Sequence, residues 1–299
     1  MSESVDCAVI GAGPAGLVGA LYLRRFRRSV LLAGKGDSRT ALIPRSHNYP
    51  GFPDGVHGKT LLSRLRRQLG RYGSPERGGE ALSLDRQGDQ WRVNLADRPV
   101  FARRILFAAG VVDRWPQLLN AQRAIDDTAL RFCPICDGFE AIKARIAVLG
   151  GDDHAAREAL FLRTYSRSVS LLASNFQLNP DMSARLAEMG VECIAIQDGS
   201  LRYSDRAIHG AQADGCPLKP FTIAYSALGV DPQTRLLAEL GASLEAGGCV
   251  IVDGKQQTSI PGIYAAGDVV RGLDQISVAM GEAAIAATDI HNSLRDEYG

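Results

Sequence analysis

The chain has 299 residues, with 34 lysines and arginines against 33 aspartates and glutamates. Such a length exceeds what a single hydrophobic core usually holds, so we expect two domains. The hydrophobic fraction of 45% excludes a disordered chain, and the near-neutral charge argues against a nucleic-acid binder. No uninterrupted apolar run reaches the roughly 18 residues that a membrane span needs, and the N-terminus lacks the regions of a signal peptide. We therefore expect a cytoplasmic protein.

The first thirty residues predict a strand, a helix and a second parallel strand. Residues 5–10 are apolar and predict a buried strand, residues 17–26 follow helical spacing, and residues 29–32 predict the second strand. This is a βαβ unit of the kind found in α/β proteins with a parallel sheet.

A glycine-rich turn joins the first predicted strand to the helix. Gly11-x-Gly13-x-x-Gly16 permits a tight turn and a close approach of the backbone to a diphosphate, which the N-terminus of the helix would bind. The acidic residue that usually binds a ribose is missing, because Ala33 and Gly34 end the second strand. The motif thus predicts a dinucleotide site and leaves open whether the ligand is FAD or NAD.

The next hundred residues contain fewer regular elements. Residues 47–55 hold too many prolines and glycines for a helix or strand. Residues 59–71 return to helical spacing, and their arginines are interpreted as a solvated face rather than a site for an acidic partner. Residues 92–95 and 104–108 predict strands.

A second βαβ unit starts in the middle of the chain. Residues 145–149 predict its first strand, a helix follows that ends near Thr164, and residues 169–172 predict its second strand. Near the C-terminus we expect a strand over 262–266 and a final helix over 275–294. Two such units predict two Rossmann-like nucleotide-binding domains of the α/β class.

Two cysteines have the spacing of a redox-active pair. Cys133 and Cys136 are close enough to form a small reversible disulfide ring, and a CxxC lowers the pKa of one thiol. The alternative, half of a zinc site, would need a second pair, and the other cysteines form none. Cys7 and Cys193 lie in apolar strand patterns and are expected to be buried.

Three motifs in this order resemble the low-molecular-weight thioredoxin reductase family. They are the glycine turn over 11–16, the Cys-Pro-Ile-Cys-Asp-Gly segment over 133–138, and Thr-Ser-Ile-Pro-Gly-Ile-Tyr-Ala-Ala-Gly-Asp over 258–268. The larger disulfide reductases are excluded, because they carry a His-Pro dipeptide near the C-terminus, where this chain has His291 followed by Asn292.

The resemblance implies a three-layer ββα fold with one domain inserted in the other. Residues 1–112 and 245–299 would form a discontinuous FAD-binding domain, and residues 113–244 would form the domain with the CxxC and a second Rossmann unit. The resemblance also implies a homodimer.

The resemblance further assigns the site residues. Cys136 would face the flavin as the charge-transfer thiolate, Cys133 would attack the substrate disulfide, and Asp137 would move the proton of the reacting thiol. Asp268 would contact the ribityl chain, with Gln275 and Ile276 beside the ring and Asn48 nearby. The expected FAD-binding positions are Gly11, Gly13, Pro14, Ala15, Gly16, Gly34, Asn48, Ala109, Gly110, Gly267, Asp268, Gln275 and Ile276.

The second glycine turn departs from the family pattern for NADPH. It reads Gly150-x-Asp152-x-x-Ala155, which places a carboxylate where the diphosphate would lie. The His-Arg-Arg cluster for the 2′-phosphate is replaced by Ala-Ser-Asn over 173–175. We therefore expect NADPH not to bind in the usual mode.

A metal at residues 152–154 is not expected either, because adjacent side chains diverge.

The sequence thus predicts an enzyme that exchanges electrons between FAD, the cysteine pair and an external thioredoxin-like or small disulfide or dithiol. The other redox partner would be ferredoxin or oxygen, and the CxxC would rest against the flavin. One alternative is an ordinary NADPH-dependent thioredoxin reductase whose cofactor charge comes from Arg157, Arg163 or Arg167. Another is a flavin-binding redox sensor without turnover.

Overall fold

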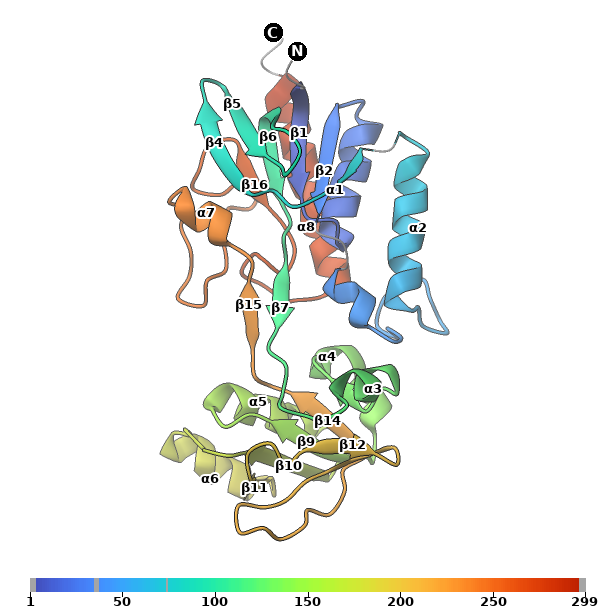
Figure 1. Ribbon diagram of the computed structural model, residues 1–299, viewed down its shortest axis with the longest axis vertical. Helices are drawn as coiled ribbons and strands as arrows, with labels where there is room; N and C mark the ends of the chain where they lie inside the picture. Colours follow the sequence, from blue (N-terminus) through green and yellow to red (C-terminus); the bar gives the residue numbers. More distant parts are fainter. Residues whose placement is uncertain (1–3, 35–37, 74, 296–299) are drawn as a thin grey trace.

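The computed structural model describes residues 4–34, 38–73 and 75–295. Within them the chain forms two α/β domains joined by two extended strands, which run side by side between the domains in Figure 1. The first and last regular elements both lie in the first domain, so the second domain is an insertion. The predicted α/β class with two Rossmann-like domains is confirmed.

The first domain is built on a seven-stranded sheet in the order β3-β2-β1-β6-β5-β4, with β16 paired to β6. β1, β2, β3, β6 and β16 run parallel, whereas β4 and β5 form an antiparallel extension. The strands are β1 (Ser4–Ile10), β2 (Val30–Gly34), β3 (Glu76–Gly78), β4 (Ser83–Gln87), β5 (Gln90–Asn94), β6 (Val100–Phe107) and β16 (Ile263–Ala265).

Alternation along β1 gives this sheet a buried face on each side. Cys7 and Val9 pack in a core with the helices, whereas Ala8 and Ile10 pack in a second core that includes residues of β4 and β5. Burial on both faces is the usual condition of a parallel sheet. The helical elements of this domain are α1 (Pro14–Arg25), η1 (Arg39–Leu42), α2 (Gly58–Gly70), α7 (Arg235–Glu239) and α8 (Ile276–Arg295).

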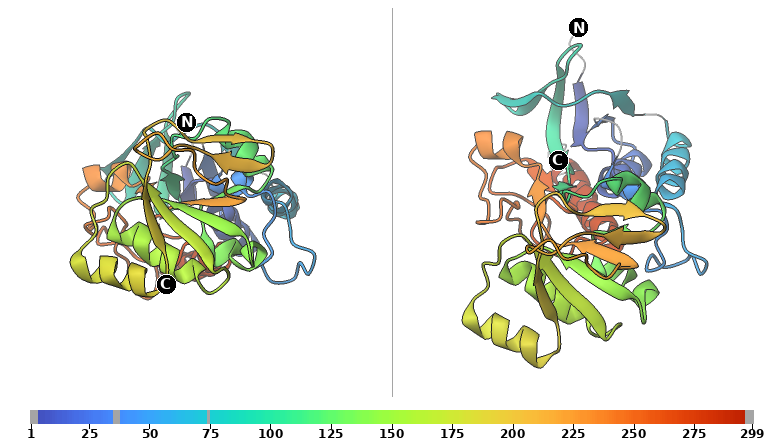
Figure 2. Two further views of the ribbon diagram at one scale, coloured as in Figure 1. Left: turned by 90° about the horizontal axis from the view of Figure 1, so that it is seen from below. Right: turned by 60° about the horizontal axis from the view of Figure 1, so that its bottom comes forward.

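The inserted domain has a parallel sheet in the order β11-β10-β9-β14-β8. Figure 2 shows this sheet, in green to orange, from two further sides. Its strands are β8 (Leu130–Arg131), β9 (Arg145–Leu149), β10 (Ser168–Ala173), β11 (Glu192–Ala195) and β14 (Ile223–Ser226), with a hairpin of β12 (Arg202–Ser204) and β13 (Ala207–His209). Its helical elements are α3 (Ala121–Asp126), α4 (Pro134–Asp137), η2 (Phe139–Ala141), α5 (Asp153–Leu162) and α6 (Pro180–Glu188).

The two linking strands are β7 (Val111–Asp113) and β15 (Val230–Pro232), which pair antiparallel. After β15 the chain is already back in the first domain, because Leu236 and Leu237 of α7 are buried in its core. The return to the first domain therefore comes earlier than the predicted boundary at residue 245, since an amphipathic five-residue helix gives little sequence signal of which core it joins.

Most of the long elements agree with the sequence pattern within one or two residues, but α1 begins three residues before the expected start at 17 and β6 begins four residues before the expected start at 104. Residues 47–55 form no helix or strand. The prediction that Cys193 is buried is wrong, because β11 is the edge strand of its sheet and this side chain is exposed. Among the residues that the structure describes, no helix combines the length and apolar character needed to cross a membrane.

Candidate active site: a cysteine pair at the domain interface

The first glycine turn has the geometry that only glycine permits. Gly11 has a φ of +115°, and a Cβ there would lie 2.1 Å from the carbonyl oxygen of Ala108. A Cβ on Gly16 would lie 1.8 Å from the carbonyl oxygen of Gly11. Helix α1 begins beyond Gly13 without a side-chain cap and without an acidic residue in its first turn. Its first N–H groups and its positive dipole end are thus available to an anion.

Other predicted FAD positions gather around this turn. A Cβ on Gly34 would lie 2.7 Å from the Cβ of Ala12, and one on Gly267 would lie 3.0 Å from the Cβ of Ala15. Ala109 is the second residue after β6, at the same carboxyl edge of the sheet. Close backbone approach, glycines and an uncapped helix N-terminus fit the diphosphate of a dinucleotide such as FAD.

We expect Gly16→Ala to yield a protein that no longer retains flavin, because the added methyl group would overlap the backbone of Gly11. The ratio of flavin to protein absorbance after purification measures this loss. Gly281→Ala in α8 is the matched control, since a Cβ there meets nothing within 4 Å and should add helix stability of about 0.5–1 kcal/mol. Normal flavin content in Gly16→Ala would contradict the assignment of the turn.

The cysteine pair begins the short helix α4. Cys133 and Cys136 are joined by a disulfide, with their Cα atoms 5.3 Å apart. The backbone N–H of Cys136 donates to Cys133 Sγ over 3.1 Å. Such a hydrogen bond favours the thiolate form of Cys133 once the pair is reduced.

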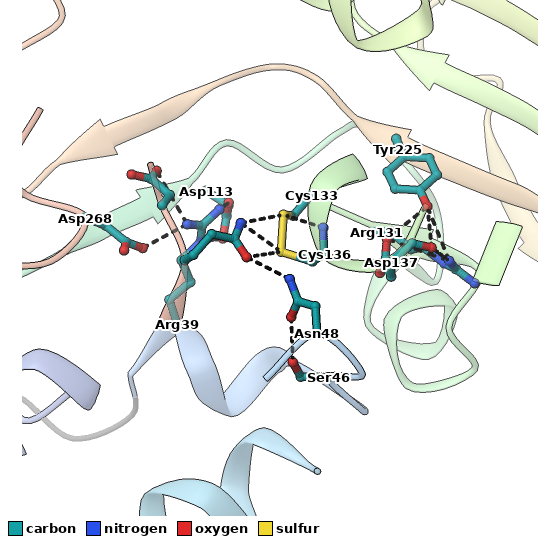
Figure 3. The surroundings of a disulfide bond; sticks show 12 residues. Arg39, Ser46, Asn48, Asp113, Arg131, Cys133, Cys136, Asp137, Tyr225 and Asp268 are labelled. Carbon is teal, nitrogen blue, oxygen red and sulfur yellow. Dashed lines mark hydrogen bonds and ion pairs between the residues drawn. A yellow bond between two sulfur atoms is a disulfide. The ribbon is translucent and has the colours of Figure 1, made fainter. Parts of the chain in front are cut away.

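The disulfide contacts the first domain through a chain of polar side chains (Figure 3). Gln275 Nε2 lies 3.5 Å from both Cys133 Sγ and Cys136 Sγ. The amide of Asn48 donates to Gln275 Oε1 over 2.8 Å, and Ser46 Oγ donates to Asn48 Oδ1 over 3.0 Å. Gln275, a position expected near the flavin ring, therefore contacts the cysteine pair, and Asn48, a second such position from a distant part of the chain, holds the Gln275 side chain. Ile276 follows as the first residue of α8.

Asp137 directly follows Cys136 in the chain, and its side chain is partly buried, with 29% of its surface exposed. Tyr225 Oη donates to Asp137 Oδ1 over 2.9 Å, and Arg131 Nη1 lies 3.7 Å from the same oxygen. Burial raises the pKa of Asp137 to about 6, although Arg131 and Tyr225 act in the opposite direction. Sequence reasoning missed both partners, since neither belongs to a motif.

A second polar cluster links Asp268 to the interdomain strand β7. Arg39 donates to both carboxylate oxygens of Asp113, over 2.8 and 2.7 Å, and through Nη1 to Asp268 over 3.0 Å (Figure 3). Asp274 lies nearby, and burial together with Asp268 raises its pKa to about 6. Nothing in the local sequence around Arg39 pointed to this role.

The second glycine turn carries an N-cap carboxylate and contacts the loop after β10. Asp152 caps α5, because its Oδ1 accepts a hydrogen bond from the N–H of Ala155 over 2.9 Å. The N–H of Gln177 donates to the carbonyl of Gly151 over 2.6 Å, and a Cβ on Gly151 would lie 2.2 Å from the carbonyl oxygen of Asn175. The loop after β10 therefore packs directly on this turn. In the described part of the chain, no group of three or more His, Cys, Asp or Glu residues could hold a metal ion.

The fold, the first glycine turn and the cysteine pair together define a flavin-dependent disulfide oxidoreductase of thioredoxin-reductase architecture. The chain belongs to the pyridine nucleotide-disulphide oxidoreductase family, which matches it over residues 5–283.

Two relatives and one solved structure illustrate the similarity. The chain is 29% identical over 307 residues to the bifunctional thioredoxin reductase/thioredoxin of Mycobacterium leprae (strain TN), covering 98% of this chain and 67% of that protein. It is 29% identical over 313 residues to NADPH-dependent thioredoxin reductase 3 of Arabidopsis thaliana, covering 97% of this chain but only 58% of that protein, less than two thirds of its length. The thioredoxin reductase of Streptococcus pyogenes MGAS5005 matches with a TM-score of 0.89 at 25% identity, covering 99% of this chain and 100% of that chain.

Proposed function

We propose that this protein exchanges electrons between bound FAD, the Cys133–Cys136 pair and an external disulfide or dithiol, without NADPH. The observation that carries the proposal is the contact of the disulfide with Gln275, which is held by Asn48 in the FAD-binding domain. This contact supports a position of the redox-active pair beside residues expected at the flavin ring. The external partner is a thioredoxin-like protein or a small dithiol, and the other redox partner is ferredoxin or oxygen.

The two sulfurs have different surroundings, which supports different roles. Cys136 Sγ also lies 3.7 Å from Gln275 Oε1, so it is the sulfur we assign to the flavin side. Cys133 accepts a backbone hydrogen bond that favours its thiolate, so it is the sulfur we assign to exchange with the partner. Asp137 takes and returns the proton of the exchanging thiol. FAD, when bound, supplies a two-electron acceptor or donor beside the pair.

Two features of the second glycine turn support the absence of NADPH from the reaction. Asp152 already uses the N–H of Ala155, and its charge would repel a phosphate at about 4 Å by roughly 4 kcal/mol at an effective dielectric near 20. That repulsion corresponds to a loss of affinity of about a thousandfold. The carbonyl oxygen of Asn175 also lies 2.2 Å from the position of a Cβ on Gly151, so the loop after β10 crowds this turn.

The second candidate is an NADPH-dependent thioredoxin reductase, which is favoured by the name of the Arabidopsis relative. It would need a rebuilt phosphate site. Arg163 is a poor source of the charge, because it donates to the carbonyls of Met189 and Ser166. Arg157 and Arg167 are exposed and remain candidate sources of that charge.

The homodimer and the cytoplasmic location stay predictions.

An anaerobic titration of the flavin-loaded protein separates the two candidates. We expect stoichiometric NADPH to leave the flavin absorbance unchanged, because the second glycine turn repels and excludes its diphosphate. Dithiothreitol or reduced thioredoxin should bleach the flavin or produce a long-wavelength charge-transfer band.

Bleaching by NADPH would instead establish the ordinary reductase. If dithiol reacts and NADPH does not, re-oxidation of the reduced protein by oxygen, with formation of peroxide, assigns the oxidase direction. Slow reaction with oxygen and rapid electron exchange with ferredoxin would assign the other direction.

A further inference from the structure

Asp137 is held by two side chains that enter from neighbouring strands of the inserted domain. β14 and β8 run parallel, and Tyr225 is the register partner of Arg131. Tyr225 is fully buried, and Arg131 is only 9% exposed. Because these residues sit side by side in the sheet, both side chains reach Asp137, and they converge on it in Figure 3.

The three residues form a closed set of hydrogen bonds. Tyr225 Oη lies 2.9 Å from Asp137 Oδ1 and 3.1 Å from the carbonyl oxygen of Asp137. Arg131 Nη1 donates to that carbonyl over 2.6 Å and to Tyr225 Oη over 3.2 Å. The contacts therefore fix the backbone of Asp137 as well as one oxygen of its carboxylate.

We propose that Arg131 and Tyr225 are positioning residues that set the proton affinity of Asp137 for thiol–disulfide exchange at the cysteine pair. This inference rests on the proposed function, since it requires that Asp137 act as acid and base for the pair.

The charges around Asp137 explain why such control is needed. Burial makes the carboxylate form unfavourable, and Glu140 adds repulsion, so both raise the pKa of Asp137. Arg131 and Tyr225 lower it and hold it at about 6. Without them the side chain would stay protonated to higher pH. An acid with a pKa near the working pH can both release and regain a proton.

The step that Asp137 serves is the reduction of the pair by a dithiol. Asp137 takes the proton of the incoming thiol, and the resulting thiolate attacks Cys133 Sγ, so that the Cys133–Cys136 bond breaks and Cys136 leaves as a thiolate. The second thiol of the dithiol then attacks the mixed disulfide and displaces Cys133, which receives the proton held by Asp137. The dithiol is oxidised to a disulfide, the pair gains two electrons, and the proton of the second thiol passes to solvent.

The test is the pH dependence of the single-turnover reaction of the flavin-loaded protein with dithiothreitol. Flavin absorbance reports the rate, which is divided by the concentration of the dithiothreitol thiolate at each pH. In the proposed step Asp137 holds the proton of the incoming thiol when the thiolate attacks, so the rate per thiolate follows the protonated form of Asp137 and falls as pH rises through its pKa. We expect Arg131→Met to move this fall to higher pH by about one to three units, as for loss of a neighbouring opposite charge. Tyr225→Phe should give a smaller shift in the same direction.

Two further variants separate positioning from a merely structural role. Arg131→Lys keeps the positive charge and should restore most of the wild-type midpoint. Tyr203→Phe is the matched control, because Tyr203 is another buried tyrosine of this domain that donates to an aspartate, Asp127, over 2.9 Å. It should leave the midpoint unchanged.

The inference is overturned if the rate per thiolate of the wild-type protein falls with pH and both Arg131→Met and Tyr225→Phe show this fall at the wild-type pH. An equal shift in Tyr203→Phe would also overturn it, because the effect would then be general to the domain. A wild-type protein that does not react with dithiothreitol at any pH would instead contradict the proposed function.

Discussion

Cys133→Ser and Cys136→Ser should each lose dithiol–disulfide turnover by roughly 10³-fold or more, because each removes a sulfur that must form or break a covalent bond. A serine hydroxyl cannot form a disulfide. Each variant therefore lacks the disulfide that takes up and releases two electrons. Steady-state reduction of a small disulfide or oxidation of dithiothreitol measures the effect in whichever direction the wild-type protein works.

The two variants should differ in what they trap. Cys136→Ser leaves Cys133 able to form a mixed disulfide with the partner but unable to resolve it, and intact-mass analysis should detect this adduct. Cys133→Ser should accumulate much less of it, because the remaining thiol, Cys136, contacts both the nitrogen and the oxygen of the Gln275 amide, whereas Cys133 contacts only the nitrogen. Cys216→Ser removes an exposed cysteine outside the pair and serves as the control. Full function of Cys136→Ser in cells would favour the redox-sensor alternative over an enzyme.

Arg39→Met should lower the free energy of unfolding by about 3–5 kcal/mol, the usual cost of removing one partner from a buried ion pair. The substitution would leave the carboxylate of Asp113, whose side chain is 5% exposed, without its bidentate partner. Asp268 would lose the same guanidinium. Urea unfolding of the flavin-loaded protein measures the change.

Matched variants show whether the loss comes from the unpaired charge. Combining Arg39→Met with Asp113→Asn should recover part of the free energy of unfolding, because a neutral amide then replaces the unpaired buried carboxylate. Arg114→Met is the control in the same linker, since Arg114 and Asp231 are 2.6 Å apart but more than half exposed. Water and salt screen a solvent-exposed ion pair. Arg114→Met should therefore lower the free energy of unfolding much less than Arg39→Met does. Equal losses at both arginines would contradict the interpretation of Arg39.

Arg39 also has a consequence for the arrangement of the domains. Asp113 ends β7, one of the two strands that connect the domains, whereas Asp268 belongs to the first domain. The guanidinium therefore ties the linker to the domain that holds the glycine turn.

The local motifs were readable without the fold because their geometry is set over a few residues. Within this one turn Gly11 has a positive φ, and both Gly11 and Gly16 make close backbone contacts that leave no room for a Cβ. The Cys133–Cys136 disulfide spans three positions, so its formation needs no distant partner. The substitution at Asp152 was equally visible, since a capping carboxylate acts on the N–H of its own helix three residues on.

The contacts that give these motifs their setting join residues far apart in the chain, and no local pattern encodes them. Gln275 reaches the disulfide from 139 and 142 positions away, and Tyr225 reaches Asp137 from 88 positions away. Arg39 meets Asp113 and Asp268 across 74 and 229 positions. Each pairing exists because parallel strands bring their ends to one edge of a sheet and the two linking strands hold one domain against the other. Local residue chemistry therefore identifies the redox pair and its cofactor turn, whereas the folded chain determines which side chains surround them and how their protons are held.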